Sequence, residues 1–228
     1  MCIEASWPLD RAALSAALRA RLARGTRAAR DAVPVAEGIT PRLDRATLHE
    51  VVAGDADAAL GFCAMLLGRA GGPVVWIGPA PSGFGRYGLS PASLVVVPAA
   101  RGDDALWAME EALRCPALGG VLLRMEAVPT GAAARLMVAA ETGGTLGLLL
   151  RQEDATPLAE VATRWRISAL AGAGALGDPR WSLALLRGRA ETGQWEATWR
   201  ASLDRLDVDT PEPPEAKPKR IRRAPSGR

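Results

Sequence analysis

Short, almost wholly apolar runs alternate with helical segments through the middle of this chain, and that alternation restricts the fold more than any other feature. The runs PVVWIGP (73–79) and SLVVVPA (93–99) are nearly continuous in apolar residues, as strands buried on both faces of a parallel sheet are. Further strands are predicted at 48–54, 120–126 and 145–151, and helices at 55–72, 103–115 and 129–144. Together they predict an α/β fold whose mainly parallel central sheet is flanked by helices.

The pattern changes after Gln152. The segments TRWRISAL (163–170), RWSLALLRG (180–188) and QWEATWRA (194–201) alternate with period two, and each contains tryptophan. Three such segments joined by short turns predict an antiparallel extension at the C-terminal side of the sheet.

The two ends of the chain differ in composition from its body. Residues 9–31 are rich in Ala, Leu and Arg and predict a helix, and the prolines and glycine that follow predict a linker, so residues 1–43 form an N-terminal helix and linker ahead of a core at 44–206. Residues 207–228 are rich in proline and basic side chains, which predicts a disordered tail. Of the net charge of +3, residues 1–31 hold +3 and residues 211–228 hold +4, which leaves −4 for residues 32–210. The body is therefore not expected to be a dedicated polyanion-binding surface.

Metal and membrane chemistry have little support in the sequence. The three cysteines lie far apart, and His49 is the single histidine, so neither a zinc site nor a disulfide framework is expected. A lone histidine on a strand is interpreted as structural. Since no apolar run reaches the length of a membrane span, a soluble, cytoplasmic protein with no membrane partner is expected.

A strand that ends at glycine and leads into a helix is the architecture in which phosphate-binding loops hold nucleotides. That chemistry needs GxxxxGK[ST], because the lysine reaches the terminal phosphates and the hydroxyl binds magnesium. The corresponding stretch here has no lysine or hydroxyl, and its carboxylates would repel a polyphosphate. We therefore predict a degenerate phosphate loop and an ordinary capped helix, with no nucleotide cofactor; the residues concerned are Gly54, Asp55, Asp57 and Leu60.

The second nucleotide signature is also altered. A Walker-B carboxylate should end the strand at 120–126, and Arg124 stands in its place. Glu126 lies two residues on and shares the face of Arg124, so a shifted substitute is the alternative. We predict no catalytic residues, no bound metal and no enzymatic activity.

The order of these elements follows the RecA core, and particular blocks resemble the ImuA family over about residues 44–203. The most specific block is DALWAMEEALRCPAL, supported by LHEVVAGD, PVVWI, ARLMVAAE before GLLLR, and TRWRI followed by PRWSLALLRGR. ImuA proteins are RecA-related and are encoded beside ImuB, a Y-family polymerase homologue, and an error-prone replicative-type polymerase. The resemblance implies an accessory role in damage-induced (SOS) translesion synthesis, with ImuB as partner and RecA and the replicative-type polymerase as further candidates. The family has also been labelled SulA-like, after a cell-division inhibitor.

Nucleic acid and partner contacts have separate candidates. The mobile DNA-binding loops of RecA would fall at about 125–130 and 152–162, where this chain is acidic and has no lysine or arginine. Of the tryptophans, those in strands (Trp76, Trp165, Trp181, Trp195 and Trp199) are expected in the core, whereas Trp107 is a candidate partner anchor. The tail has a basic cluster that either contacts DNA or an acidic partner or is simply solvated: Lys217, Lys219, Arg220, Arg222 and Arg223.

Three functions remain open from the sequence. The first is a non-catalytic adaptor that binds the polymerase homologue. The second is a divergent RecA-like ATPase with an unorthodox site around Gly54 and Glu126. The third is a SulA-type division inhibitor, which has no residue-level support.

Overall fold

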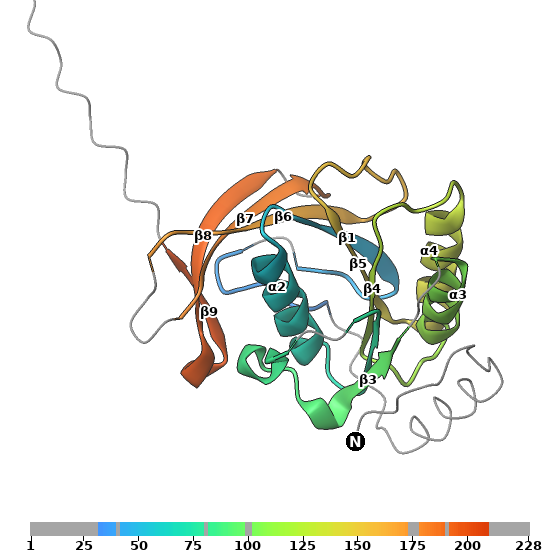
Figure 1. Cartoon of the computed structure of the whole chain (residues 1–228), viewed down its shortest axis with the longest axis horizontal. Helices are drawn as coiled ribbons and strands as arrows, with labels where there is room; N and C mark the ends of the chain where they lie inside the picture. Colours follow the sequence, from blue (N-terminus) through green and yellow to red (C-terminus); the bar gives the residue numbers. More distant parts are fainter. Residues whose placement is uncertain are drawn as a thin grey trace, which may run out of the picture.

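The computed structural model of the chain describes residues 32–39, 42–79, 82–98, 102–172, 178–189 and 192–209. Over these ranges one nine-stranded sheet runs through the molecule in the order β3-β2-β4-β5-β1-β6-β7-β8-β9 (Figure 1). The helix predicted at 9–31 lies outside the described residues. No helix within them is long and apolar enough to cross a membrane.

Six neighbouring strands form the parallel half of the sheet. In spatial order they are β3 (Leu94–Val97), β2 (Val74–Ile77), β4 (Gly120–Arg124), β5 (Leu146–Gln152), β1 (Thr47–Ala53) and β6 (Thr163–Ala169), and each adjacent pair is parallel. Their carboxyl ends therefore meet at one edge of the sheet, the edge at which open α/β folds bind ligands.

Helices cover both faces of this half, which is why strands such as β2 and β3 are apolar throughout. Helix α2 (Ala56–Arg69) packs on one face, while α3 (Gly102–Leu113) and α4 (Ala132–Gly143) pack on the other (Figure 1). Alternate residues of a strand enter the two cores: Trp76 lies in the α2 core, and its neighbour Val75 lies in the α3 and α4 core.

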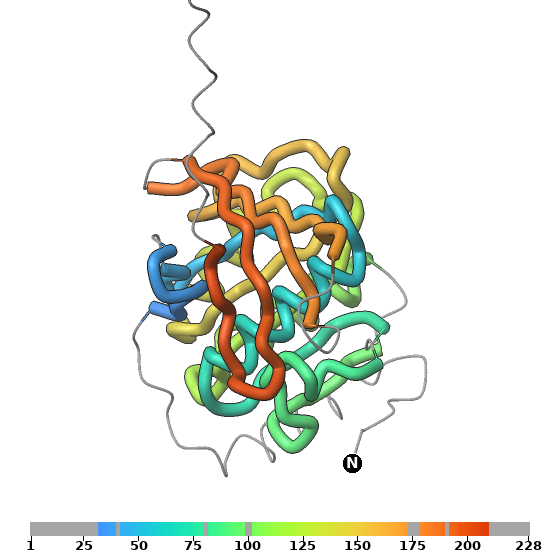
Figure 2. The backbone as a smooth tube through the Cα atoms, turned by 90° about the vertical axis from the view of Figure 1, so that its left-hand side faces the viewer, coloured from blue at the N-terminus to red at the C-terminus, as the bar shows by residue number. Residues whose placement is uncertain are grey.

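The C-terminal half is antiparallel, with one difference from prediction. Strands β7 (Arg180–Arg187), β8 (Gly193–Arg200) and β9 (Arg205–Asp209) pair antiparallel in succession, and Figure 2 views them from the β9 side. Strand β6 pairs antiparallel with β7, as predicted. On its other side it pairs in parallel with β1, because the preceding connection of residues 153–162 is long enough to return the chain in the same direction. Strand β9 was not predicted at all.

The packed body extends past the predicted limits of 44 and 206 at both ends. At the C-terminal end, β9 continues to Asp209. At the N-terminal end, the segment before β1 is fixed by a bridge between Val33 and Leu43, and the Arg69 guanidinium donates to the carbonyl oxygens of Pro34 and Val35. Four side chains of this segment are buried in the α2 core: Val33, Val35, Ile39 and Leu43.

The strand tryptophans lie in the core, as predicted. Trp76, Trp165, Trp181 and Trp199 are fully buried, and Trp195 is half-buried. Phe62 of α2 contacts two of these rings. It meets Trp181 edge to face, and its ring centroid lies 6.2 Å from that of Trp165. These rings join α2 to the antiparallel strands and account for most of the chain's aromatic residues without a base-stacking role.

Candidate functional site

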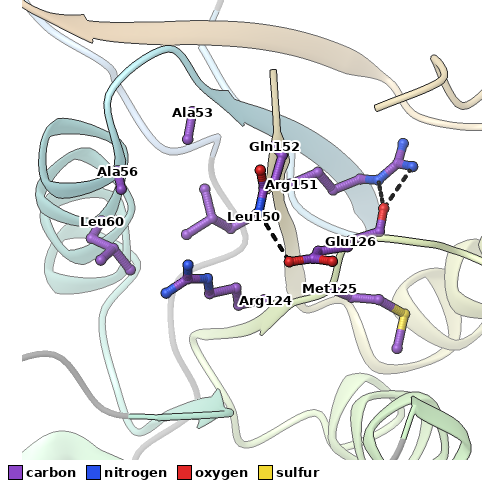
Figure 3. A pocket seen from close by; sticks show the side chains of 9 residues that line it. All are labelled: Ala53, Ala56, Leu60, Arg124, Met125, Glu126, Leu150, Arg151 and Gln152. Atoms are coloured by element: carbon purple, nitrogen blue, oxygen red, sulfur yellow. Dashed lines mark hydrogen bonds between the residues drawn. The ribbon is translucent and has the colours of Figure 1, made fainter. Parts of the chain in front are cut away.

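A cavity of about 140 Å³ opens at the carboxyl ends of β1, β4 and β5, beside the start of α2 (Figure 3). This is the position of the nucleotide site in folds of this kind. Its lining residues are Ala53, Ala56, Leu60, Arg124, Met125, Glu126, Leu150, Arg151 and Gln152.

The connection between β1 and α2 is much shorter than a phosphate-binding loop. Strand β1 ends at Ala53 and α2 begins at Ala56, so only Gly54 and Asp55 join them. The motif GxxxxGK[ST] needs a loop several residues long to surround a phosphate. Asp57 and Leu60, which align with the phosphate-loop motif, lie in α2, in agreement with the helix predicted at 55–72. The strand and helix that support such a loop are present, but the loop itself is missing.

The backbone amides of this connection already have acceptors. The amides of Gly54 and Asp55 both donate to the carbonyl oxygen of Ile167 on β6, at 2.9 and 3.1 Å. The amide of Ala58 donates to Asp55 Oδ1 at 2.8 Å, so the carboxylate of the chain occupies the helix N-terminus that would otherwise attract an anion. Gly54 is explained by packing, since a Cβ atom there would lie 2.1 Å from Ser168 Oγ. The glycine fits close contact with β6 and needs no phosphate.

Arg124 and Glu126 occupy the end of β4, where a Walker-B acid would lie. Arg124 is exposed, and Figure 3 shows its side chain extending toward Leu60 of α2. The Glu126 carboxylate accepts a hydrogen bond of 2.9 Å from Gln152 Nε2 (Figure 3). Within the described part of the chain no group of three or more His, Cys, Asp or Glu side chains is placed to bind a metal ion.

A buried ion triad lies behind the cavity and was not predicted from the sequence. Glu50, in the middle of β1, is wholly buried; its Oε1 lies 2.7 Å from Arg151 Nη1, and its Oε2 lies 2.9 Å from Arg164 Nη1. The two arginines are 5% and 8% exposed. Because a buried charge without a counterion is very costly, the three side chains depend on one another.

The remaining donors of the triad fix two loops. Arg151 donates to the carbonyl oxygens of Glu126, at 3.1 Å, and of Thr156, at 2.6 Å, while Arg164 donates to that of Ala155 at 2.8 Å. Arg187 adds bonds to the carbonyl oxygens of residues 158 and 159. The connections at 125–131 and 153–162 are therefore held by the interior of the protein.

These two loops present acidic side chains to solvent. Glu126, Glu153, Asp154 and Glu160 are exposed, and neither loop contains lysine or arginine. A second hollow of about 450 Å³ lies between the loops, at residues 126–128, 151–152 and 154–156. Negative charge at this position opposes the phosphate backbone of DNA, because nucleic acid affinity depends on neutralising phosphates with cations.

The other predicted site residues lie elsewhere. Trp107 on α3 is half-buried and packs against the α3 and α4 core, so it is only partly available to a partner. His49 is buried, and burial lowers its pKa to about 4, which agrees with a structural role. The basic cluster of Lys217, Lys219, Arg220, Arg222 and Arg223 lies outside the described residues.

Comparison with known proteins identifies the fold and no family. No protein-family model matches the chain, and no curated protein matches it. Among solved structures, the crystal structure of the RadB recombinase is similar, with a TM-score of 0.55 and 13% sequence identity over 72% of this chain and 92% of that chain. The chain thus has a RecA-like α/β fold, as predicted, with a mainly parallel sheet and C-terminal antiparallel strands.

Proposed function

We propose that this chain is a non-catalytic adaptor in damage-induced, error-prone translesion DNA synthesis. It binds an ImuB-type Y-family polymerase homologue through a RecA-like surface, in an assembly that also includes RecA and an error-prone replicative-type polymerase. The resemblance of DALWAMEEALRCPAL and its accompanying blocks to the ImuA family supports the process. The RecA-like fold, which is shared with a recombinase, is consistent with it.

The observation that carries the non-catalytic part is the two-residue connection between β1 and α2. The amides of Gly54 and Asp55 are bonded to Ile167, and the Asp55 carboxylate occupies the helix N-terminus, so the two residues of the connection offer a triphosphate no amide donor. The cavity volume of about 140 Å³ is also below the roughly 300–1,000 Å³ typical of small-molecule sites. A RecA-like body that lacks a phosphate-binding loop still presents the outer surfaces of that fold, and a partner protein can bind to them.

Partner binding is tested by co-purification of the full chain with the Y-family polymerase homologue that is encoded beside it. We expect a complex at micromolar concentration, which corresponds to roughly −8 kcal/mol of binding free energy. An unrelated protein of similar charge on the same resin is the control. If no complex forms at that concentration, the adaptor function is wrong.

Nucleotide binding is tested by titration calorimetry with ATP and magnesium. We expect no binding tighter than millimolar for the full chain, and none for Asp55→Ala either, because removal of the cap does not lengthen the connection. Affinity tighter than millimolar that Glu126→Ala abolishes would instead overturn the absence of a nucleotide site and favour a divergent ATPase. The Asp55→Ala variant distinguishes two reasons for the absence of ATP binding. If the Asp55 carboxylate alone blocks the helix N-terminus, the variant binds ATP; if the loop is too short, it does not.

A further inference from the structure

Arg124 is the one accessible cation of the cavity. Elsewhere at this end of the sheet the arginines have partners: Arg151 and Arg164 contact Glu50, and Arg166 contacts Glu153. Among the residues that the structure describes, Arg124 has no ion-pair or hydrogen-bond partner, although it is only two residues from Glu126. A guanidinium at a cavity mouth that has no partner among the described residues is suited to bind an acid, because its planar fork matches a carboxylate.

The walls of the cavity define the rest of the ligand. Ala53, Ala56, Leu60 and Leu150 make one side apolar, and Figure 3 shows Arg124 extending along that side. A cavity of about 140 Å³ is close to the roughly 150 Å³ that holds a benzene molecule in a protein interior. It therefore accepts one aliphatic side chain, and it is too small for a nucleoside or a larger metabolite.

Charge favours a single carboxylate over a phosphate. On the opposite wall, Gln152 fixes the Glu126 carboxylate. The negative charge of Glu126 offsets the single positive charge that remains because Arg151 and Arg164 share one carboxylate, that of Glu50. A carboxylate carries one negative charge, which matches the single positive charge of Arg124. A phosphate dianion or a polyphosphate would bring additional negative charge close to Glu126.

We propose that this cavity is a docking site for a partner protein, in which an aliphatic side chain enters between Leu60 and Leu150 and an adjacent aspartate or glutamate binds Arg124. The site occupies the position of the nucleotide pocket in this fold and takes a peptide anchor in its place. The inference rests on the proposed adaptor function and deepens it, since it names the surface and the chemistry of the segment that binds there. A small, partly apolar hole beside one charged group is the geometry of an interface anchor.

The site is tested with isocaproate, which combines an isobutyl group with a carboxylate, by NMR titration of the full chain. We expect saturable shifts at millimolar concentration in the methyl signals of Leu60 and Leu150 and in the Nε signal of Arg124. Arg124→Gln, a change at an exposed side chain that leaves the fold intact, should weaken the affinity about threefold to tenfold. The neutral isocaproamide should bind the unaltered chain more weakly by a similar factor.

Arg189→Gln is the matched control, because Arg189 is 92% exposed and contacts Asp44, which lies just before the amino end of β1, away from the cavity. It should bind isocaproate as the unaltered chain does. The proposal fails if Arg124→Gln binds isocaproate unchanged, if no saturable shift occurs at these signals, or if inorganic phosphate at equal concentration shifts them more strongly.

A second arm separates this inference from the proposed function. In co-purification with the polymerase homologue, Arg124→Glu should reduce capture about tenfold while Arg189→Glu does not. A complex that is insensitive to Arg124→Glu overturns the docking site and leaves the adaptor function standing. Failure of the unaltered chain to form any complex overturns the adaptor function and with it the identity of the partner, and the isocaproate titration then decides the chemistry of the site.

Discussion

At the scale of single residues, His49 shows how the interior fixes a protonation state. Its Nε2 lies 2.8 Å from the carbonyl oxygen of Asp44, which can only accept, so Nε2 carries the proton. Its Nδ1, 2.8 Å from Thr163 Oγ1, must then accept from that hydroxyl, which itself accepts from Trp165 Nε1 at 3.0 Å. A neutral imidazole satisfies every partner. A second proton, on Nδ1, would displace the hydrogen bond that the Thr163 hydroxyl donates and would place a charge in the interior, and burial accordingly lowers the pKa of His49 to about 4.

This lowered pKa predicts a loss of stability in mild acid. Below about pH 6.5 the unfolded chain binds a proton at His49 that the folded chain does not bind, so the free energy of unfolding falls by about 1.4 kcal/mol per pH unit until about pH 4. Full stability is present above pH 6.5, and about 3 kcal/mol is lost by pH 4. Urea unfolding at a series of pH values measures the slope.

His49→Gln is the control for this slope. It lowers stability at neutral pH, because a hydrogen-bonded ring is replaced, yet it should remove most of the pH dependence between about 6.5 and 5, since the chain has a single histidine. An equal slope in the variant would show that carboxylates, and not His49, dominate the acid response.

At the scale of elements, the Glu50 triad connects three strands and two loops. Glu50→Gln leaves the guanidinium groups of Arg151 and Arg164 buried without a counterion, which is expected to cost about 3–5 kcal/mol. The loop at 153–162, whose carbonyl oxygens these arginines bind, should also exchange its amide hydrogens faster. Urea unfolding and hydrogen exchange measure the two effects.

Glu196→Gln provides the comparison at an exposed ion pair. Glu196 contacts Arg180 at 3.1 Å and is 55% exposed, so its replacement should cost less than about 1 kcal/mol. If the two variants lost equal stability, the triad would be no more important than a surface pair. The account of two internally fixed loops would then be wrong.

The elements also show what a sequence can and cannot predict. Alternation of apolar runs with helical segments was sufficient for β1 to β5 and for α2 to α4, because burial on both faces demands those runs. Period two and the short turns predicted β6 to β8 as successive antiparallel strands, which is confirmed, but they contain no information on how β6 pairs with β1 on its other side. Strand β9 was missed because Leu206 and Val208 alternate with charged residues in a segment whose composition merges into the tail.

The candidate site was predictable only in part, for the same physical reasons. The missing lysine and the cap at Asp55 are local, and the sequence shows both. The short connection was also predictable, because the strand was predicted to end at Gly54 and the helix to begin directly after it. The acceptor of the Gly54 and Asp55 amides was not, since Ile167 lies far along the chain. The partners of Glu50 lie 101 and 114 residues away in the chain. A lone acid in an apolar strand indicates that it needs a cationic partner, but it does not identify the arginines that provide the charge.

At the scale of the whole molecule, the limits of the folded unit are set by packing and not by composition. The segment from Val33 to Leu43 looks like a linker because of its proline and glycine, yet four of its side chains are buried in the α2 core: Val33, Val35, Ile39 and Leu43. Arg69 of α2 binds its backbone and also lies over the Trp199 ring, 5.7 Å from the centroid. The segment thereby joins α2 to the antiparallel strands.

A chain that begins at residue 44 should therefore fail to fold stably, whereas a chain that begins at residue 32 should keep a cooperative transition. Four buried aliphatic side chains contribute roughly 1.5–3 kcal/mol each, a total comparable with the 5–15 kcal/mol by which whole domains are stable. The near-ultraviolet dichroism of the buried tryptophans, followed during heating, reports the loss of packing. If the shorter chain melted at the temperature of the longer one, the segment would cover the core without being needed for folding. If only the longer chain melts cooperatively, the segment ahead of β1 is part of the fold. Every test of partner binding must then include it.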